Sequence, residues 1–271
     1  MLHADGRPGA WGNLGLWSAA TPDYFGACAA LARAVANTAG LRAGDRVLAV
    51  ACGAGEELRL WHDFGAIEVA AVERDPALVR AARALAPAAQ VLEGSGTTLL
   101  ELGLPERHFD RVLCVDAAYH LQPRGAFLQA AWQLLRPGGT LAYTDLVAER
   151  PGPLLRGAAR LCGLHADALQ GEAAQRERLR ALRFVGVRIE RLDDAVLGGF
   201  ARFVRRRRVA PWRWPRVAIT AALIGPCRAA GLGYAMLSAT RPGEHAADSM
   251  PSATASAERT ALSSSGTPGI A

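Results

Sequence analysis

Residues 47–57 read VLAVACGAGEE, and this stretch predicts a short buried strand that turns into a helix. The apolar run at its start is typical of a strand that is covered on both faces in a parallel sheet. Gly53 and Gly55 follow, and glycine lets the backbone turn sharply and approach a ligand closely. The helix that begins near Glu56 presents unpaired N–H groups at this turn. We therefore expect a ligand-binding loop here, of a kind that many α/β folds share.

The alternation of strand and helix continues on both sides of this turn. Strands are predicted at 47–50, 67–73, 91–93, 109–115 and 140–145. Helices are predicted at 21–39, 56–64, 75–85 and 124–135, and the run RPGG at 136–139 predicts a tight turn. Strands that alternate with helices in this way indicate a parallel sheet with helices on both faces. Ligands of such sheets bind beyond the carboxyl ends of the strands.

The regular alternation of strands and helices ends after Asp145, and the sequence there predicts a cap. Helices are expected at 153–165, at 168–182, from 194 onward and at 214–229, with strands at 184–191 and 232–239. The first two helices are expected to cover the site, so the cap and substrate region spans about 150–215. Residues 1–12 are predicted to be flexible, residues 13–241 to form the folded domain, and residues 242–271, which are rich in small and polar residues, to be disordered.

Glu73 ends the second predicted strand and is the first candidate for a ligand contact. Its spacing of roughly 20 residues from Gly53 is that of an acid which accepts hydrogen bonds from ribose hydroxyls. The alternative is a solvated charge at a strand end. The following Asp75-Pro76, which begins a helix, favours the binding interpretation.

Glu56 and Glu57 distinguish between two classes of nucleoside cofactor. A nicotinamide dinucleotide places its pyrophosphate at this helix start, where two carboxylates would repel it. A cofactor that carries a positive sulfonium and no phosphate tolerates them. The pattern favours S-adenosylmethionine, and a nicotinamide-dependent oxidoreductase is kept as an alternative.

Four segments together resemble a known family. They are GDRVLAVACGAGEE at 44–57, VAAVERDP at 69–76, HFDRVLCVDAAYHL at 108–121 and FLQAAWQLLRPGGTLAYTD at 127–145. In this order and spacing they resemble class I S-adenosylmethionine-dependent methyltransferases, in the small-molecule branch that includes sterol, tocopherol, quinone, sugar and amine methyltransferases. The resemblance covers about residues 11–150.

The resemblance implies a fold and an activity. The fold is a Rossmann-like, seven-stranded, mostly parallel sheet with helices on both faces and a helical cap. The activity is methyl transfer from S-adenosylmethionine to an oxygen, nitrogen or carbon atom of a small, lipophilic molecule. A non-catalytic relative that binds the cofactor and serves as a partner subunit is the second alternative.

The resemblance also implies the residues that hold the cofactor. They are Ala51, Cys52, Gly53, Gly55, Glu73, Arg74, Ser95, Asp116, Ala117, Trp17 and Tyr24. Arg74 is expected to cover the adenine, and Ser95 stands where an Asp usually accepts from the adenine amine. Trp17 and Tyr24 are expected to close the pocket or, equally, to pack the first helix on the sheet.

Ala49 and Ala51 depart from the family pattern, which has an acid and then a glycine at these positions. The acid commonly orients the ammonium end of the cofactor, so its loss is expected to weaken binding by about 1–3 kcal/mol if nothing substitutes. If position 51 needs a positive φ, alanine there costs about 1–2 kcal/mol.

His120, Tyr119 and Asp145 are the candidate catalytic residues. His120 lies in the loop that leaves the fourth strand, where a neutral imidazole can take a proton from the acceptor. Asp145 is expected to orient His120 or to contact the substrate, and Tyr119 to offer a hydroxyl or a cation-π surface. The alternative for His120 is that it only shapes the pocket.

Charge and cysteine content limit the remaining function classes. All basic residues are Arg; nine of them, and no acid, lie between 195 and 243, so the rest of the chain is acidic although the total is +6. The segment 202–216, with Trp212 and Trp214, suits an anionic membrane surface or a phosphate group, or is a solvated basic face. No nucleic-acid motif accompanies it, and no Cys or His grouping has the spacing of a metal site.

The expected location is cytoplasmic with peripheral membrane contact, because the chain lacks a signal-like start. The apolar stretch 217–240 is about membrane length, but Pro226, Arg228 and several Gly interrupt it, which favours a helix followed by a strand.

Overall fold

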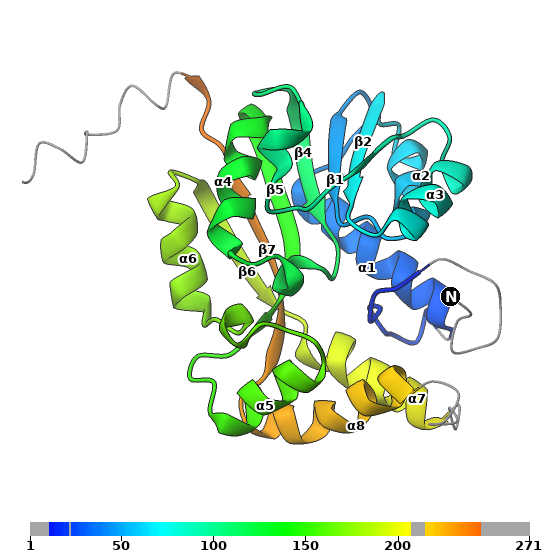
Figure 1. The fold of residues 1–271 in the computed structure, drawn as a ribbon, viewed down its shortest axis with the longest axis vertical. Helices are drawn as coiled ribbons and strands as arrows, with labels where there is room; N and C mark the ends of the chain where they lie inside the picture. The colour runs from blue at the N-terminus through cyan, green and yellow to red at the C-terminus, as the bar shows by residue number, and fades with distance from the viewer. Residues whose placement is uncertain (1–10, 22, 207–214, 245–271) are drawn as a thin grey trace, which may run out of the picture.

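A computed structural model describes residues 11–21, 23–206 and 215–244 of the chain. They contain a seven-stranded sheet in the order β3-β2-β1-β4-β5-β7-β6 (Figure 1). Neighbouring strands are parallel from β3 to β5, whereas β7 runs antiparallel to both β5 and β6. The strands are β1 Arg46–Val50, β2 Glu68–Glu73, β3 Gln90–Glu93, β4 Phe109–Cys114, β5 Leu135–Val147, β6 Val185–Arg191 and β7 Gly233–Thr240. The predicted seven-stranded, mostly parallel α/β fold is confirmed.

Eight α-helices are present among the described residues. They are α1 Tyr24–Ala39, α2 Glu56–Asp63, α3 Pro76–Leu85, α4 Arg124–Leu134, α5 Pro153–Leu161, α6 Glu172–Ala181, α7 Gly199–Arg206 and α8 Pro215–Ala229. Four further short helical turns lie in the connections between elements, namely η1 Leu99–Leu102, η2 Ala118–His120, η3 Ala166–Ala168 and η4 Asp194–Gly198. The side chain of Asp75 caps α3 by accepting from the N–H of Ala77, as its position before Pro76 predicts.

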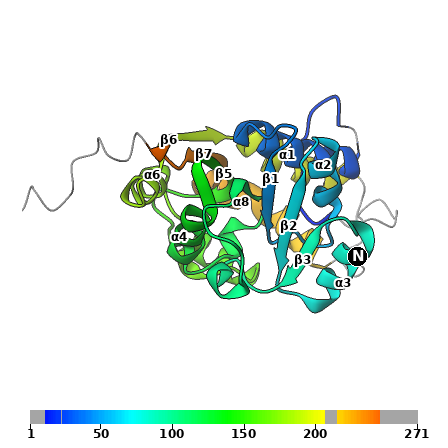
Figure 2. The ribbon, with the colours of Figure 1, turned by 90° about the horizontal axis from the view of Figure 1, so that it is seen from above.

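Strand β1 divides the core into two halves, because successive side chains of a strand point to opposite faces. Val47 and Ala49 pack with buried residues of α1, α2 and α3, whereas Leu48 and Val50 pack with those of η1 and α4. The helices therefore cover both faces of the sheet, as the alternating pattern predicts (Figure 2).

The predicted tight turn at 136–139 falls inside strand β5, where these four residues stand opposite one residue of β4. Strand β5 continues through these residues, and its register against β4 shifts between Phe109 and Arg111. Gly138 has φ +80°, and its N–H donates to the carbonyl of Arg241, which follows β7. The run RPGG is thus a bulge that stays paired, because glycine permits the left-handed conformation inside the strand.

Helices α5, α7 and α8 form the cap, beyond the carboxyl ends of the strands at the bottom of Figure 1. Helix α6 does not belong to it, although residues 168–182 were expected to cover the site. It packs against β6 instead, with Leu179 wholly buried on the face of the sheet that α4 also covers.

No helix within residues 11–206 and 215–244 is both long and apolar enough to cross a membrane, and 217–240 contains α8 and then β7.

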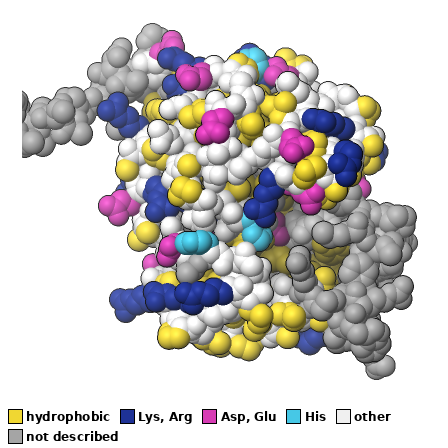
Figure 3. Space-filling model, viewed as in Figure 1, with side chains coloured by type: hydrophobic (Ala, Val, Ile, Leu, Met, Phe, Trp, Pro, Cys, Tyr) yellow, Lys and Arg dark blue, Asp and Glu magenta, His cyan; other side chains and the backbone are white. Residues whose placement is uncertain are grey.

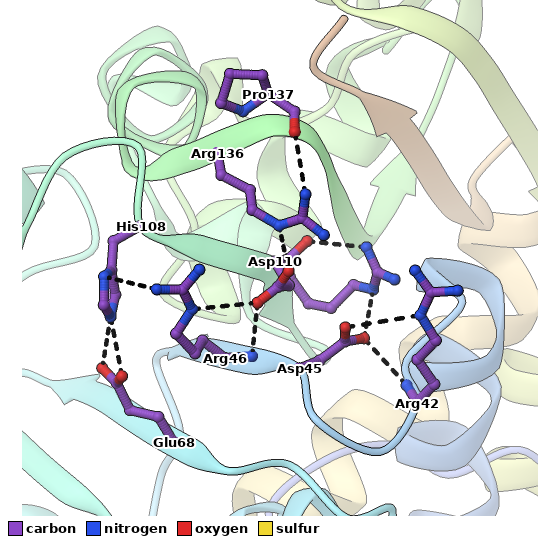
Figure 4. Close-up of polar contacts among 9 residues, drawn as sticks. Arg42, Asp45, Arg46, Glu68, His108, Asp110, Arg136 and Pro137 are labelled. Carbon is purple, nitrogen blue, oxygen red and sulfur yellow. Dashed lines mark hydrogen bonds and ion pairs between the residues drawn. The ribbon is translucent and has the colours of Figure 1, made fainter. Parts of the chain in front are cut away.

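A network of ion pairs holds the opposite, amino-terminal edge of the sheet (Figure 4). Asp110 accepts from the backbone N–H of Arg46 at 2.8 Å and pairs with the guanidinium groups of Arg46 and Arg136. Burial alone would raise the pKa of Asp110, but these contacts lower it below its ordinary value. His108 bridges Arg46 and Glu68, so the network ties the starts of β1, β2 and β4 to the bulge in β5.

The ends of the chain lie largely outside the described residues. Of the segment 1–12, which was expected to be flexible, Trp11 is described and is 9% exposed. Of the predicted tail 242–271, the described Glu244 receives a hydrogen bond from Arg107 at 2.6 Å. Residues 1–10 and 245–271 are not among the described ones.

Candidate active site

The turn after β1 has the backbone geometry that its glycines predict. Gly53 and Gly55 have φ +58° and +91°, and a Cβ on Gly55 would lie 2.9 Å from Cα of Ala82 in α3. Ala51 also has a positive φ, +59°, and its N–H donates to the carbonyl of Val72 at 2.8 Å. The departure at position 51 therefore places a methyl group where the family's glycine avoids strain.

Glu73, at the end of β2, is joined to this turn. Its Oε1 accepts from the N–H groups of Arg74 at 2.9 Å and Asp75 at 3.0 Å, and its Oε2 accepts from the N–H of Gly53 at 3.0 Å. The carboxylate is 6% exposed. Because each carboxylate oxygen accepts about two hydrogen bonds, Oε2 keeps one site for a ligand.

Two neighbouring cavities lie along the turn. The turn cavity, of about 480 Å³, is lined by Trp11, Gly12, Asn13, Ala51, Cys52, Gly53, Ala54, Glu56, Glu57, Ala77, Leu78, Ala81, Val115, Asp116, Ala117 and His120. The strand cavity, of about 160 Å³, is lined by Ala51, Val72, Glu73, Arg74, Gly94, Gly96, Ala117, His120 and Leu121. They share Ala51, Ala117 and His120, so one elongated ligand can span both.

The donors of these two cavities fit a cationic nucleoside. Glu73 offers a free acceptor in the strand cavity, where Arg74 also lies. The turn cavity holds three carboxyl groups and no Arg from the described residues, which disfavours a pyrophosphate and favours a positive ligand. Gly96 is required beside them, since a Cβ there would lie 2.7 Å from Val50 Cγ1. The residues present thus fit S-adenosylmethionine.

A third cavity, the cap cavity, opens between the sheet and the cap. It measures about 200 Å³ and is lined by Gly12, Leu14, Asp116, Tyr119, His120, Leu146, Leu155, Ala158, Ala159, Cys162, Leu164, Leu169, Leu197, Thr220, Leu223, Ile224, Cys227 and Leu232. This lining is predominantly apolar and includes residues of α5 and α8. The turn cavity and the cap cavity share Gly12, Asp116 and His120.

Asp116 is held rigidly where these two cavities meet. It has φ +53°, and its Oδ1 accepts from the hydroxyls of Tyr119 at 2.9 Å and Tyr234 at 2.7 Å. Its Oδ2 accepts from the N–H of Leu14 at 2.6 Å. Burial raises the pKa of Asp116 to about 6 against these three hydrogen bonds, so the group is ionised at neutral pH. The pKa of Tyr119 is raised by burial and by Asp116, which keeps its hydroxyl a donor.

His120 lines all three cavities. Partial burial and the neighbouring Arg74 and Arg124 lower its pKa below the ordinary value of 6.5, so the imidazole is neutral at pH 7. Its ring lies 4.7 Å from that of Tyr119 and makes no hydrogen bond to another described side chain. A neutral, unengaged imidazole at the junction is suited to accept a proton.

Contrary to the sequence prediction, Asp145 does not lie where it could orient His120. Its side chain is wholly buried in an ion pair with Arg124, and its Oδ2 also accepts from Nε2 of Gln175 at 2.7 Å. It lines none of the three cavities and does not contact His120. Because β5 runs on to Val147, Asp145 lies within the strand rather than at its end, where it joins β5 to α4 and α6.

Three further expected cofactor contacts lie elsewhere. The Nε1–H of Trp17 donates to the carbonyl of Leu14, and its ring stacks on Phe203 at 4.6 Å. The hydroxyl of Tyr24 donates to the carbonyl of Asn13 at 2.7 Å, so it holds the segment that lines the turn cavity. The hydroxyl of Ser95 lies 2.8 Å from that of Thr97 and lines neither the turn nor the strand cavity. Trp17 and Tyr24 therefore fit the alternative expectation, in which they serve packing and do not close the cofactor pocket.

Some lining residues escaped the sequence analysis. Gly12 and Asn13 line the turn cavity from a segment assigned partly to a flexible end. Tyr234 reaches Asp116 from β7 and carries no local signal, because its partner is remote in the chain. Glu57 was noted only for repelling phosphate, yet it lines the turn cavity; its place directly after the glycine turn was the available signal.

Comparison with known proteins gives one family and several relatives. The family described as Methyltransferase domain matches residues 48–143. Erythromycin 3''-O-methyltransferase of Saccharopolyspora erythraea is 29% identical over 72% of this chain and 68% of that protein. The 27-O-demethylrifamycin SV methyltransferase of Amycolatopsis mediterranei is 30% identical over 58% of this chain and 57% of that protein.

Among solved structures, the [4+2]-cyclase SpnF superposes with a TM-score of 0.66 at 22% identity, over 85% of this chain and 87% of that one. At this identity the likeness shows the fold alone.

Proposed function

We propose that this chain, which is similar to the methyltransferase domain family over residues 48–143 and to a methyltransferase over most of its length, transfers a methyl group from S-adenosylmethionine to a lipophilic small molecule held in the cap cavity. The observation that carries the proposal is the shared lining of two unlike cavities. An acidic cavity that suits the cofactor and an apolar cavity that suits an acceptor meet at Gly12, Asp116 and His120. When bound, S-adenosylmethionine supplies an electrophilic methyl group on a sulfonium.

The chain's own residues supply position and a proton acceptor. Methyl transfer depends chiefly on holding the nucleophile and the methyl group in line at short distance. We assign cofactor binding to Ala51, Cys52, Gly53, Gly55, Glu73, Arg74, Asp116 and Ala117. His120, neutral at pH 7, takes the proton from the acceptor's hydroxyl, and Tyr119 fixes the carboxylate of Asp116 beside it.

Oxygen is the acceptor atom we favour. The two relatives described above are both named for methylation of a natural product, one of them explicitly at oxygen. A hydroxyl needs a base when it is methylated, and His120 at the junction meets that need. A carbon acceptor would also need activation, whereas a neutral amine would not.

The test is turnover with S-adenosylmethionine and a panel of lipophilic alcohols, phenols and glycosylated macrolides. Release of S-adenosylhomocysteine with a methylated product supports the proposal. Binding of both cofactor and acceptors without turnover would point instead to the non-catalytic relative kept as an alternative. Binding of NADH by fluorescence titration would favour the oxidoreductase, which the carboxylates of the turn cavity argue against.

For location, we propose that the outer face of the cap touches an anionic membrane. In the cap, Leu154 and Leu161 of α5 and Ile219 of α8 are 52%, 65% and 40% exposed. Hydrophobic side chains gather along the lower edge of Figure 3, where the cap lies. Residues 207–214, which include Trp212 and Trp214 of the Arg-rich segment, lie outside the described residues. Pelleting with anionic vesicles, compared between the wild type and the variant Leu161→Asp, tests this; equal binding contradicts it.

A further inference from the structure

Glu57 in the first turn of α2 has an unusual environment. Its side chain is 6% exposed and lines the turn cavity beside Cys52, Gly53 and Ala54. Its Oε1 is buried without a hydrogen-bond partner among the described residues. A buried polar atom without a partner is costly, and such an atom facing a cavity indicates a ligand that supplies the missing donor.

The charges around Glu57 identify the donor as a cation. The other carboxyl groups that line the turn cavity are Glu56 and Asp116, and Glu73 lies close enough to repel Glu57. From β4 and the turn, the neighbouring groups are the thiols of Cys114 and Cys52, whose pKa values burial raises, so they stay neutral. No described Arg lines the cavity to pair with Glu57.

Position 49 explains why an acceptor is needed here. The family's acid at that position commonly orients the ammonium end of the cofactor. Ala49 is wholly buried in the core that the sheet shares with α1 and α2, and a methyl group accepts no hydrogen bond. Glu57 comes two residues after Gly55 and reaches the same turn from the helix side.

We propose that Glu57 binds the α-ammonium group of S-adenosylmethionine and so replaces the acid that is missing at Ala49. This inference rests on the proposed function, because it takes the turn cavity to be the cofactor site. It assigns Glu57 to binding and orientation of the cofactor rather than to the transfer itself.

The titration of Glu57 gives the proposal a distinctive readout. Burial, and then the charge of Glu73, raises the pKa of Glu57 to about 8, so the carboxyl of the free protein is mostly protonated at pH 7. An ammonium group placed against it favours the charged form. Binding should therefore release a proton from Glu57.

The experiment is titration calorimetry with S-adenosylhomocysteine and with its analogue that lacks the amino group, at pH 7 in two buffers of different ionisation enthalpy. For the wild type we expect release of about one proton with the amino ligand and none with the analogue. For Glu57→Gln we expect no release, a Kd for S-adenosylhomocysteine raised about tenfold or more, and an unchanged Kd for the analogue.

Two further variants separate binding from folding. Glu57→Leu is expected to melt at a higher temperature than the wild type, because it removes a buried unpaired carboxyl, and still to lose affinity. Asp63→Asn, in the last turn of the same helix, is expected to change Kd by less than about threefold, because Asp63 is exposed and lines none of the three cavities. Equal losses in Asp63→Asn and Glu57→Gln would overturn the proposal.

The experiment also distinguishes a failure of the role of Glu57 from a failure of the proposed function. If the wild type does not bind S-adenosylhomocysteine, the proposed function fails. If the wild type binds it and Glu57→Gln binds it equally well with the same proton release, the function stands and the role of Glu57 is overturned.

Discussion

The hydroxyl of Tyr234 lies 2.7 Å from Oδ1 of Asp116, although 118 positions separate the two residues in the chain. The same hydroxyl lies 2.8 Å from Oγ1 of Thr144, which in turn accepts from the N–H of Asp116. The last strand therefore holds the loop that leaves β4, at the place where the turn cavity and the cap cavity meet. A residue far from the glycine turn thus sets the shape of the proposed reaction centre.

Tyr234→Phe is expected to lower both stability and turnover. The change removes a buried hydrogen bond to a carboxylate, which costs about 1.5–3 kcal/mol in unfolding free energy. Urea unfolding measures that loss, and steady-state kinetics measure turnover. Tyr143→Phe is the matched control, because Tyr143 is also wholly buried and donates to Gln175 away from the cavities. A similar fall in turnover in both variants would show that stability alone is responsible.

Glu73→Gln is expected to weaken S-adenosylhomocysteine binding about tenfold or more, which calorimetry measures. The amide cannot accept at both oxygen positions. It loses either the N–H of Gly53 together with the free acceptor on that atom, or the N–H groups of Arg74 and Asp75. Glu93→Gln is the control, because Glu93 ends the adjacent strand, is exposed and lines none of the cavities. An unchanged Kd in Glu73→Gln would remove Glu73 from the site.

His120→Gln is expected to lower turnover while Kd for S-adenosylhomocysteine is kept. The base acts in its neutral form, which dominates above its pKa, and that pKa lies below 6.5. The rate of the wild type should therefore fall only as the pH drops below 6.5. That part of the pH profile should disappear in His120→Gln. A fall centred near pH 6 that persists in the variant belongs to Asp116, and unchanged turnover would exclude the base role.

Asp145→Ala is expected to act on stability alone. It leaves the guanidinium of Arg124, which is 1% exposed, buried without its partner, and breaking such a pair costs about 3–5 kcal/mol. Chemical unfolding measures the loss, and calorimetry on the folded protein should show an unchanged Kd for S-adenosylhomocysteine. The double variant Arg124→Met with Asp145→Leu should recover most of the stability. A loss of turnover without loss of stability would return Asp145 to the active site.

Ala51→Gly is expected to stabilise the protein by up to about 1.6 kcal/mol. Relief of the strain at φ +59° is worth about 1–2 kcal/mol, and the greater freedom of glycine in the unfolded chain offsets about 0.4–1 kcal/mol of it. Thermal unfolding measures the change. Ala54→Gly in the same turn has no positive φ to relieve and should lose stability instead. A loss in both variants would mean that the alanine at 51 is not strained.

Local sequence patterns were sufficient to predict the helices, the strands and the glycine turn after β1. The alternation of apolar runs with amphipathic helices, the Asp75-Pro76 cap and the glycines after β1 all act within a few residues, so they can be read without knowing which strands pair. The strain at Ala51 was also foreseeable, because the turn needs a left-handed residue whatever surrounds it. The bulge at 136–139 was missed because a turn and a bulge use the same glycine.

Tertiary structure alone decided which side chains share the reaction centre. Antiparallel β7 enters between β5 and β6, and that order places Tyr234 against Asp116 and buries Asp145 between β5, α4 and α6. The N-terminal segment likewise becomes cavity lining because Leu14 donates to Asp116 and Tyr24 donates to the carbonyl of Asn13. The sequence by itself determined the fold and the glycine turn after β1, because both depend on interactions between residues that are close together in the chain. The arrangement of side chains where the turn cavity and the cap cavity meet depends on contacts between residues that are remote in the chain. Local periodicity carries no information about such contacts.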